Sequence, residues 1–546
     1  MVKESPVTTM SLDPDVAPYR RELTFWDLVF VSITGVVGSG WLFGSYNAAK
    51  IAGPASLIAW VIGGIVVLLG ALINGELVGM FPRAGGAMRY PLYSHGSLVA
   101  FLIGWGSWIP GAAGAATEAA AVIQYASSYL PGLFNGTTMT PEGVLVAAAL
   151  VVLFTYINWL GIRVFAKING PITVIKLAVP VATIIILFAT SFHASNLTSH
   201  GFMPYHAKSI FLALATSGIV YAYLGSSGPL ELAAEAKNPS QQIPRVLLMV
   251  VGFSFLLYTL LQLVFLAAVP PSLLNHVSWS GLSFNAPFAN LLIAVNLVWF
   301  SYFLYADAIL SPSGTALSGT AVVSRIVYAL GLEGWAPKFL AYVSEKTGVP
   351  TRALLINLLF SVLFLLPFPS WQALVGVIVT CALFIRLVIP ISHMVMRKTL
   401  PDQPRPFRTP WAMVVSPLAT MISALIIYWV GWPINGQVIL FFAIGIVFYA
   451  VSFKKQKWPT SHITHGIWFL VFMGFLAGMS WLGTYGGRHV IPAPWDSLAV
   501  AVGSLLLWGW GYASGLPIDQ ALMGGRQTSV EVRVQEPELS SFDQNF

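Results

Sequence analysis

Charged residues are scarce in this chain. Only 9% of its 546 residues are Asp, Glu, Lys or Arg, and 57% are hydrophobic. Ordinary soluble proteins carry roughly 25% charged residues, and a soluble fold of this length would need far more polar surface to cover its cores. The deficit runs along the whole chain and therefore favours a membrane protein.

Cysteine is almost absent, since Cys381 is the only one. One cysteine forms no internal disulfide, and no metal-ligand spacing is present, so neither a metal nor another cofactor is expected. The sequence also lacks the nucleophile–base cluster of an enzyme, the repeated pore segment of a channel and the soluble domain of a receptor. The net charge of +7 does not indicate nucleic-acid binding, because the basic residues fall in short loops between apolar runs.

Long apolar runs are what the chain does have. A membrane-spanning helix needs about 20 mostly apolar residues. Fourteen segments qualify, at 25–50, 55–80, 98–130, 142–160, 170–191, 209–235, 244–269, 288–330, 353–369, 371–396, 411–430, 434–453, 463–483 and 497–516. The two segments on either side of Pro367–Pro369 could instead form one broken element. A total of twelve crossings is a separate alternative that also stays open. A short segment, 1–22, precedes them, and the polar tail 517–546 is predicted to be largely disordered.

The basic residues alternate between the two sides of these segments. With the N-terminus in the cytoplasm, 22 of the 27 Lys and Arg residues fall on the cytoplasmic side and three on the other, namely Lys50, Lys208 and Arg488. Lys176 and Arg386 remain within the membrane. The positive-inside rule therefore predicts a multi-pass protein of the cell (plasma or inner) membrane with both termini in the cytoplasm.

Two segments are interrupted by glycine and serine at mid-span. The first reads SITGVVGSGW over 32–41, and the sixth reads YAYLGSSGP over 221–229. Proline and clustered glycine weaken a helix, and broken helices are tolerated in hydrocarbon only around a cavity. A polar hairpin follows the second segment inside and a linker, 270–286, follows the seventh outside. This pattern predicts two inverted repeats of five helices.

The two breaks suit a zwitterionic amino acid. Half-helix N-termini present N–H groups for a carboxylate, and half-helix C-termini present carbonyls for an ammonium. The alternative is that Gly35, Gly38 and Gly40 only allow close helix packing. The residues predicted to bind substrate are Thr34, Gly35, Val37, Gly38, Ser39, Gly40, Tyr221, Tyr223, Leu224, Gly225, Ser226 and Ser227.

Four ionisable residues lie deep in predicted membrane helices and are functional candidates for that reason. Lys176, Glu118 and Asp307 are candidates for proton coupling. For Lys176 the reason is that a buried lysine loses its proton readily. Lys176 could instead extend to the cytoplasmic interface. Arg386 is expected either to bind a side-chain carboxylate of the substrate or to pair permanently with Glu118 or Asp307.

Several motifs together resemble the amino acid–polyamine–organocation (APC) superfamily. Residues 35–40 resemble its helix-1 glycine motif, and ELVGMFPRAGGAMRYPLYSHGSLVAFLIGW, 76–105, resembles its helix-2 to helix-3 signature. Residues 235–245, 324–350 and 405–410 resemble the loop after helix 6, the end of helix 8 and the loop after helix 10. Residues 20–410 carry the resemblance, which looks closest to the aspartate–proton symporter group. The chain departs from the pattern where Ser226 and Ser227 replace an aromatic residue, and this leaves the substrate open.

The resemblance implies an all-α polytopic membrane protein. Its five-plus-five inverted-repeat, LeuT-like core would span 23–396 with broken helices 1 and 6. The apolar runs in 397–516 add about four helices, for about 14 in total, which exceeds the usual twelve-helix plan of the superfamily. It also places Lys176, Thr315 and Ser318 at the equivalent of a second sodium site. The expected function is an amino acid permease in the lipid bilayer that is coupled to protons and works by alternating access, with acidic amino acids such as aspartate as the candidate substrates. An amino acid or polyamine exchanger and a potassium importer are alternatives, and the oligomeric state is open.

Overall fold

The computed structural model describes residues 23–81, 86–231, 236–332, 334–456 and 458–522. The predicted N-terminal segment, 1–22, lies outside these ranges, and so does the predicted tail beyond residue 522. The described start of that tail contains a short helix, α22 (Ile518–Ala521). The imidazole Nε2 of His462 lies 3.1 Å from the carbonyl oxygen of Gln520 in this helix.

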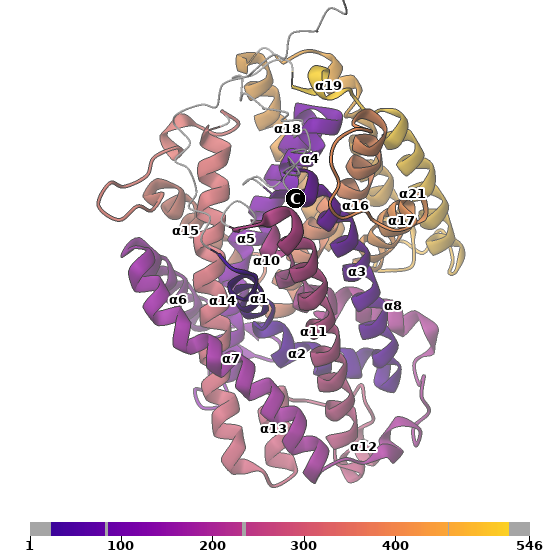
Figure 1. Cartoon of the computed structure of the whole chain (residues 1–546). Coiled ribbons are helices and arrows are strands. Elements are labelled where there is room, and N and C mark those ends of the chain that lie inside the picture. Colours follow the sequence, from indigo (N-terminus) through magenta and orange to yellow (C-terminus); the bar gives the residue numbers. More distant parts are fainter. Residues whose placement is uncertain (1–22, 82–85, 232–235, 333, 457, 523–546) are drawn as a thin grey trace, which may run out of the picture.

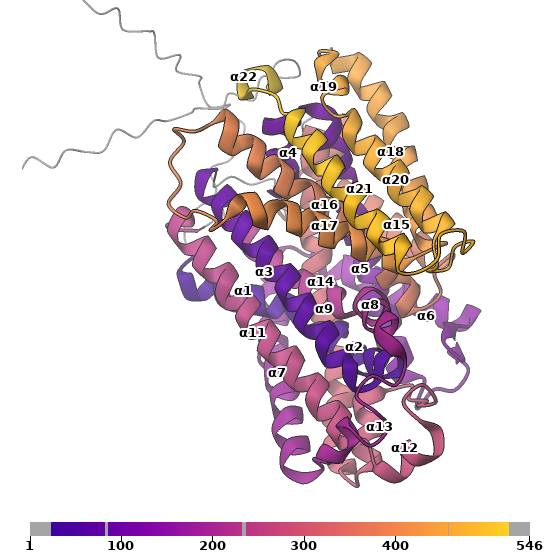
Figure 2. The same ribbon diagram turned by 90° about the vertical axis from the view of Figure 1, so that its right-hand side faces the viewer.

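The described chain is built almost entirely of helices, and most of the long ones run in a similar direction (Figures 1 and 2). The α-helices are α1 (Phe25–Val36), α2 (Ser39–Ala52), α3 (Ser56–Met80), α4 (Gly86–His95), α5 (Ser97–Ala126), α6 (Pro141–Trp159), α7 (Ile162–Thr190), α8 (His206–Thr216), α9 (Ile219–Leu224), α10 (Gly228–Glu231), α11 (Pro239–Ala268), α12 (Pro271–Val277), α13 (Pro287–Ala294), α14 (Val298–Leu332), α15 (Thr351–Leu365), α16 (Trp371–Thr399), α17 (Ala412–Val430), α18 (Ile434–Gln456), α19 (Ser461–Thr464), α20 (Ile467–Leu482), α21 (Trp495–Ala513) and α22. Short 3-10 helices are η1 (Gly53–Ala55), η2 (Ala194–Leu197), η3 (Gly225–Ser227) and η5 (Lys338–Leu340). Two short strands, β1 (Phe134–Asn135) and β2 (Thr138–Met139), form an antiparallel hairpin.

Membrane-spanning helices dominate the described residues, as predicted. Among these residues ten helical stretches are long and apolar enough to cross a membrane, with Ser39–Met80 counted as one, and the count rises to 11 if the bent pair in 206–230 is one span. The other predicted segments fall on α1, α15 and α21, which are helical without passing this test. The helical membrane class is therefore confirmed, and the total of 14 crossings stays a prediction.

One predicted boundary is wrong. The segment 288–330 is not a single long helix, because α13 ends at Ala294 and α14 begins at Val298. Asn296 between them has a φ of 62°. Asn tolerates this left-handed conformation better than most residues, and it commonly ends a helix. By contrast, α15 and α16 are separate helices, as the first interpretation of the chain near Pro367–Pro369 supposed.

Helix 1 is interrupted where the sequence predicts. Helix 6 is also interrupted, but at a different position from the predicted one. The first helix stops at Val36 and restarts at Ser39. The sixth bends by 45° between Thr216 and Ile219, whereas the predicted break at 221–229 contains only the 3-10 turn η3. Gly218 accounts for the position of the bend, because its φ is 101° and a Cβ there would overlap the indole of Trp371.

The C-terminal helices cover one side of the bundle. Figure 2 shows α18, α20 and α21 standing together on that side. Between them and the rest, α17 packs against α16, α21 and α8. The rings of Phe211 and Trp429 stack with centroids 4.4 Å apart. The extra helices thus contact α8, the part of the bent pair that precedes Gly218.

A buried carboxylate joins α3 to α16 and the loop that follows it. Glu76 is fully buried, and both of its oxygens accept hydrogen bonds from Arg397, at 2.8 and 2.6 Å. The Thr409 N–H donates to it at 2.7 Å, and nitrogens of His393 and Arg405 lie 3.0 and 3.2 Å away. This arrangement explains the motif at 405–410, because the loop folds back onto one anion.

We expect Glu76→Ala to destabilise the folded protein by about 3–5 kcal/mol, because removing one partner leaves buried cations without their anion. The measurement is thermal unfolding of the purified protein in detergent. Glu345→Ala is the control, since Glu345 is exposed and its loss should leave the unfolding temperature unchanged. Equal stability of the two variants would contradict the assigned role of Glu76.

Candidate functional site

A backbone carbonyl next to the interruption of helix 1 accepts a hydrogen bond from an ammonium group. Lys176 on α7 is fully buried. Its Nζ donates to the Thr34 carbonyl at 2.9 Å and to Thr315 Oγ1 at 2.8 Å. The side chain therefore lies against the break and does not extend to an interface, which contradicts the alternative role. Ser318, the other predicted neighbour, is not among its hydrogen-bond partners.

The N-terminus of α2, where helix 1 begins again, binds a carboxylate. Glu118 on α5 is 1% exposed. The Ser39 N–H, at the first residue of α2, donates to its Oε2 at 3.0 Å, and the Tyr221 hydroxyl donates to its Oε1 at 2.7 Å. A helix N-terminus stabilises a negative charge, so Glu118 lies where the sequence predicts a substrate carboxylate.

The two interrupted helices face one another. Gly225 packs directly on the backbone of Gly35, and a Cβ added to Gly40 would lie 2.9 Å from Ala222. These glycines thus do allow close packing, as the alternative supposed, and the same contacts bring the two breaks together. Tyr258 of α11 ties them further, because its hydroxyl donates to the carbonyls of Val36 and Ala222 at 2.8 and 3.3 Å.

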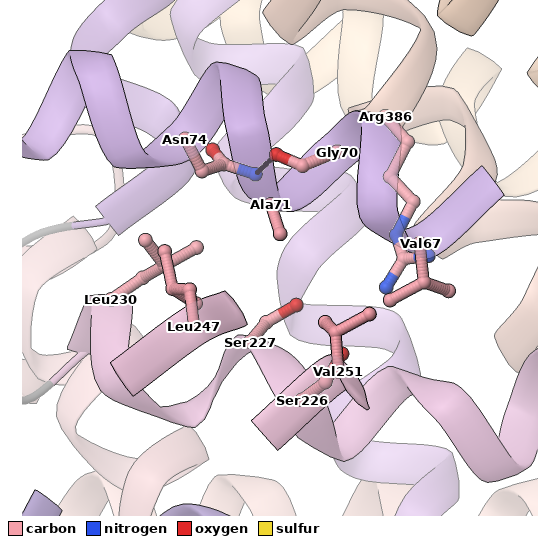
Figure 3. Close-up of a pocket in the computed structure, with 10 residues that line it drawn as sticks. All are labelled: Val67, Gly70, Ala71, Asn74, Ser226, Ser227, Leu230, Leu247, Val251 and Arg386. Carbon is pink, nitrogen blue, oxygen red and sulfur yellow. Dashed lines mark hydrogen bonds between the residues drawn. The ribbon is translucent and has the colours of Figure 1, made fainter. Parts of the chain in front are cut away.

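A small cavity opens next to the serine turn, which is the 3-10 turn η3 with Ser226 and Ser227 (Figure 3). Its volume is about 20 Å³, and its lining residues come from α3, the η3–α10 turn, α11 and α16: Val67, Gly70, Ala71, Asn74, Ser226, Ser227, Leu230, Leu247, Val251 and Arg386. This volume suffices for about one water molecule. An amino acid would therefore need the walls to separate before it could enter.

Arg386 is the single charged residue among the described residues of this lining. Figure 3 shows its guanidinium extending from α16 toward Val67, on the far side of the space from Ser227. Its Nη1 is buried and has no hydrogen-bond partner among the described residues. The predicted permanent pairing with Glu118 or Asp307 is wrong for this structure. Glu118 is bonded to Ser39 and Tyr221, and neither buried oxygen of Asp307 has a hydrogen-bond partner within the part of the chain that the structure describes.

The predicted residues divide into three groups. Thr34, Gly38, Ser39 and Tyr221 surround the break with Lys176 and Glu118. Ser226 and Ser227 line the cavity instead. Tyr223 belongs to neither, because its hydroxyl donates to the Trp60 carbonyl at 3.3 Å. Asp307 makes no hydrogen bond to Lys176.

The Val37 carbonyl and the side chain of Leu224 complete the predicted set. Val37 O accepts from Ser311 Oγ at 3.2 Å and from Thr315 Oγ1 at 3.4 Å, so it is already occupied by hydroxyl groups of α14. Leu224 precedes the 3-10 turn and is half-buried. Neither therefore offers a free polar group to a ligand in this structure.

Sequence reasoning missed three polar contributors to the break: Tyr258, Ser311 and Trp371. Trp371 Nε1 donates to Ser39 Oγ at 2.8 Å, and its ring meets that of Tyr221 edge-on with centroids 5.8 Å apart. A useful signal for Tyr258 was present, because a tyrosine within an apolar helix needs a partner for its hydroxyl. The identity of that partner was not readable from the sequence.

Comparison with known proteins adds the family. A family model described as "Amino acid permease" matches residues 23–453. The chain is 38% identical over 512 residues to the glutamate/serine transporter AimA of Bacillus subtilis (strain 168), an alignment that covers 91% of this chain and 94% of the relative. It is 33% identical over 508 residues to the aspartate-proton symporter of the same organism, with 91% and 97% covered.

A more distant relative is the branched-chain amino acid permease BcaP of Bacillus subtilis (strain 168), at 25% identity over 452 residues, covering 80% of this chain and 94% of the relative. The relatives are transporters and not enzymes, and the two with the higher identities include the aspartate-proton symporter that the sequence motifs resemble. Together with the apolar helices and the paired breaks, these matches make the chain a multi-pass membrane transporter. It belongs to the amino acid permease family of the APC superfamily.

Proposed function

We propose that the protein takes up amino acids together with protons, that it prefers acidic substrates, and that it works by alternating access. The observation that carries the substrate preference is Arg386, which lines a cavity beside the serine turn and whose Nη1 has no hydrogen-bond partner among the residues that the structure describes. A buried arginine is costly unless it finds an anion. Guanidinium geometry matches a carboxylate, so a second carboxylate on the substrate would supply the missing partner.

Proton coupling is supported by the groups around the helix-1 break. Lys176 bridges Thr34 and Thr315, where a deprotonated amine would hold the two helices less strongly than an ammonium. Glu118 and Asp307 are two further buried carboxyls that could carry a proton. Gain and loss of a proton at Lys176 would thereby change how α1 is held against α7 and α14.

Names of relatives favour the same substrate class. One relative is described as an aspartate-proton symporter and another as a glutamate/serine transporter. Serine is a neutral amino acid that does not need Arg386. The decisive experiment is therefore uptake of radiolabelled aspartate, glutamate, serine and leucine by proteoliposomes, with and without an imposed pH gradient. We expect gradient-dependent accumulation of aspartate or glutamate, and transport of neutral amino acids alone, without competition from either acid, would refute the acidic preference.

The proposed architecture has fourteen crossings, a core of two inverted five-helix repeats, and both termini in the cytoplasm. We expect reporter fusions after Lys237 and Lys455 to read cytoplasmic and those near Gly281 and Gly436 to read external, because the basic residues are so unequally distributed. The measurement is paired phosphatase and fluorescent-protein fusions at each site. A reversed result at any one of the four sites would contradict the proposed topology of the helices next to that site.

A further inference from the structure

We infer that Glu118 is an internal stand-in for the substrate carboxylate, which occupies the N-terminus of α2 when ionised and gives way only when it is protonated. This inference rests on the proposed function and specifies how proton and substrate are coupled. The proposed substrate carboxylate and the Glu118 carboxylate have the same chemistry. They would use the same backbone donor.

The contact is built into the core. Ser39 N, which donates to Glu118 Oε2 at 3.0 Å, begins a helix of 14 residues. The second oxygen is held by the Tyr221 hydroxyl at 2.7 Å, and Tyr221 belongs to α9, the helix that follows the bend in helix 6. The carboxylate thus connects α5 to both interrupted helices, and its position depends on their relative placement.

Space at the break is fully used. A Cβ added to Gly38 would lie 2.9 Å from Glu118 Oε1 and 2.9 Å from Thr315 Oγ1. A second carboxylate cannot reach Ser39 N–H unless Glu118 leaves it. Two carboxylates sharing one site also disfavour each other's charge, so that one of them tends to hold a proton.

The carbonyl end of the same break is also bonded to a side chain of the protein itself. Lys176 Nζ bonds the Thr34 carbonyl, four residues before Gly38. The chain therefore presents its own ammonium to the carbonyl end of the break and its own carboxylate to the N–H end. This arrangement imitates the two charges of a zwitterionic amino acid, and it supplies the polar groups of the break with partners from the chain itself.

Protonation changes this balance. A neutral carboxyl group is a weaker acceptor than a carboxylate, so the Ser39 N–H becomes available to an incoming substrate carboxylate. The local charge stays the same, because one negative charge replaces another. When the substrate leaves, Glu118 loses its proton and returns to Ser39. The titratable groups that face Glu118 are Tyr221 on α9, Lys176 on α7 and Tyr258 on α11.

The test is equilibrium binding of radiolabelled L-aspartate to purified protein across a range of pH. For the wild type, affinity should fall by about tenfold per pH unit once Glu118 is ionised, because binding then requires uptake of one proton. Glu118→Gln should bind aspartate with an affinity that no longer depends on pH. It should also exchange aspartate across proteoliposomes but fail to accumulate it under a pH gradient. Glu142→Gln, an exposed residue in the first turn of α6, is the control and should keep the wild-type slope.

Two results would overturn the inference. Glu118→Gln could keep the wild-type slope, or it could fold and bind no aspartate at all. Should Glu118→Gln not fold, Tyr221→Phe decides, because loss of the hydroxyl loosens the carboxylate and should raise affinity at alkaline pH relative to the wild type. An unchanged Tyr221→Phe profile would refute it. A wild-type protein that binds neither aspartate, glutamate nor serine would instead overturn the proposed function, and this inference with it.

Discussion

Lys176→Ala is expected to abolish uptake driven by a pH gradient while leaving the protein folded in the membrane. The lysine connects the Thr34 carbonyl to Thr315 across the helix-1 break, and alanine can neither form this bridge nor carry a proton. Lys176→Arg should also fail, because arginine stays protonated and cannot release the proton within the cycle. The measurement is aspartate accumulation in proteoliposomes with the interior alkaline relative to the medium.

Two controls separate coupling from folding. Lys346→Ala removes an exposed lysine and should accumulate aspartate as the wild type does. Lys176→Ala should remain homogeneous in size-exclusion chromatography. Its free energy of unfolding should fall by no more than about 1–3 kcal/mol, the typical effect of leaving buried acceptors without a donor. Normal proton-driven accumulation by a folded Lys176→Ala or Lys176→Arg would refute the role of the lysine.

The membrane class and the first break were predictable because both are local properties of the sequence. Twenty apolar residues in succession specify a span wherever they fold. The cluster Gly35, Gly38 and Gly40 weakens one short stretch of helix regardless of its surroundings. For the same reason the charges of Lys176 and Glu118 marked them as functional candidates, since a buried charge requires a partner in any membrane fold.

The second break was misplaced because its cause is not local. The serines and Pro229 made 221–229 look irregular, yet these residues continue as a 3-10 turn and a short helix. The actual bend occurs at Gly218, a single glycine between apolar residues. Its position is set by Trp371, which lies 153 residues further along the chain and fills the space that a side chain at 218 would need.

Partners could not be predicted for a similar reason. Arg386 was expected either to bind a substrate or to pair with one of two acidic residues. The sequence around Arg386 does not distinguish these alternatives. Glu118 is instead used by Ser39 and Tyr221, contacts that depend on how two interrupted helices cross. The direction in which each buried charge points is a tertiary property, and it is there that the structure added most to the sequence.

Arg386→Gln is expected to weaken transport of acidic amino acids far more than that of neutral ones. Glutamine keeps a polar side chain of smaller size but removes the charge, and hydrogen bonds to charged groups contribute about 1.5–3 kcal/mol. The KM for aspartate should therefore rise roughly ten- to hundredfold. The KM for serine should change little, because serine has no second carboxylate for the guanidinium to bind.

The comparison between substrates is what makes this experiment decisive, since a fold defect would lower every rate together. Arg325→Gln, at an exposed position on α14, is the matched control and should leave both KM values unchanged. If Arg386 is structural, its variant should lose aspartate and serine transport equally. In that case Nη1, which has no partner among the described residues, would have to be satisfied by water or by another conformation of the chain. A selective loss of aspartate would instead place the second carboxylate of the substrate in this cavity, and it would require α3, α11 and α16 to separate there before transport can begin.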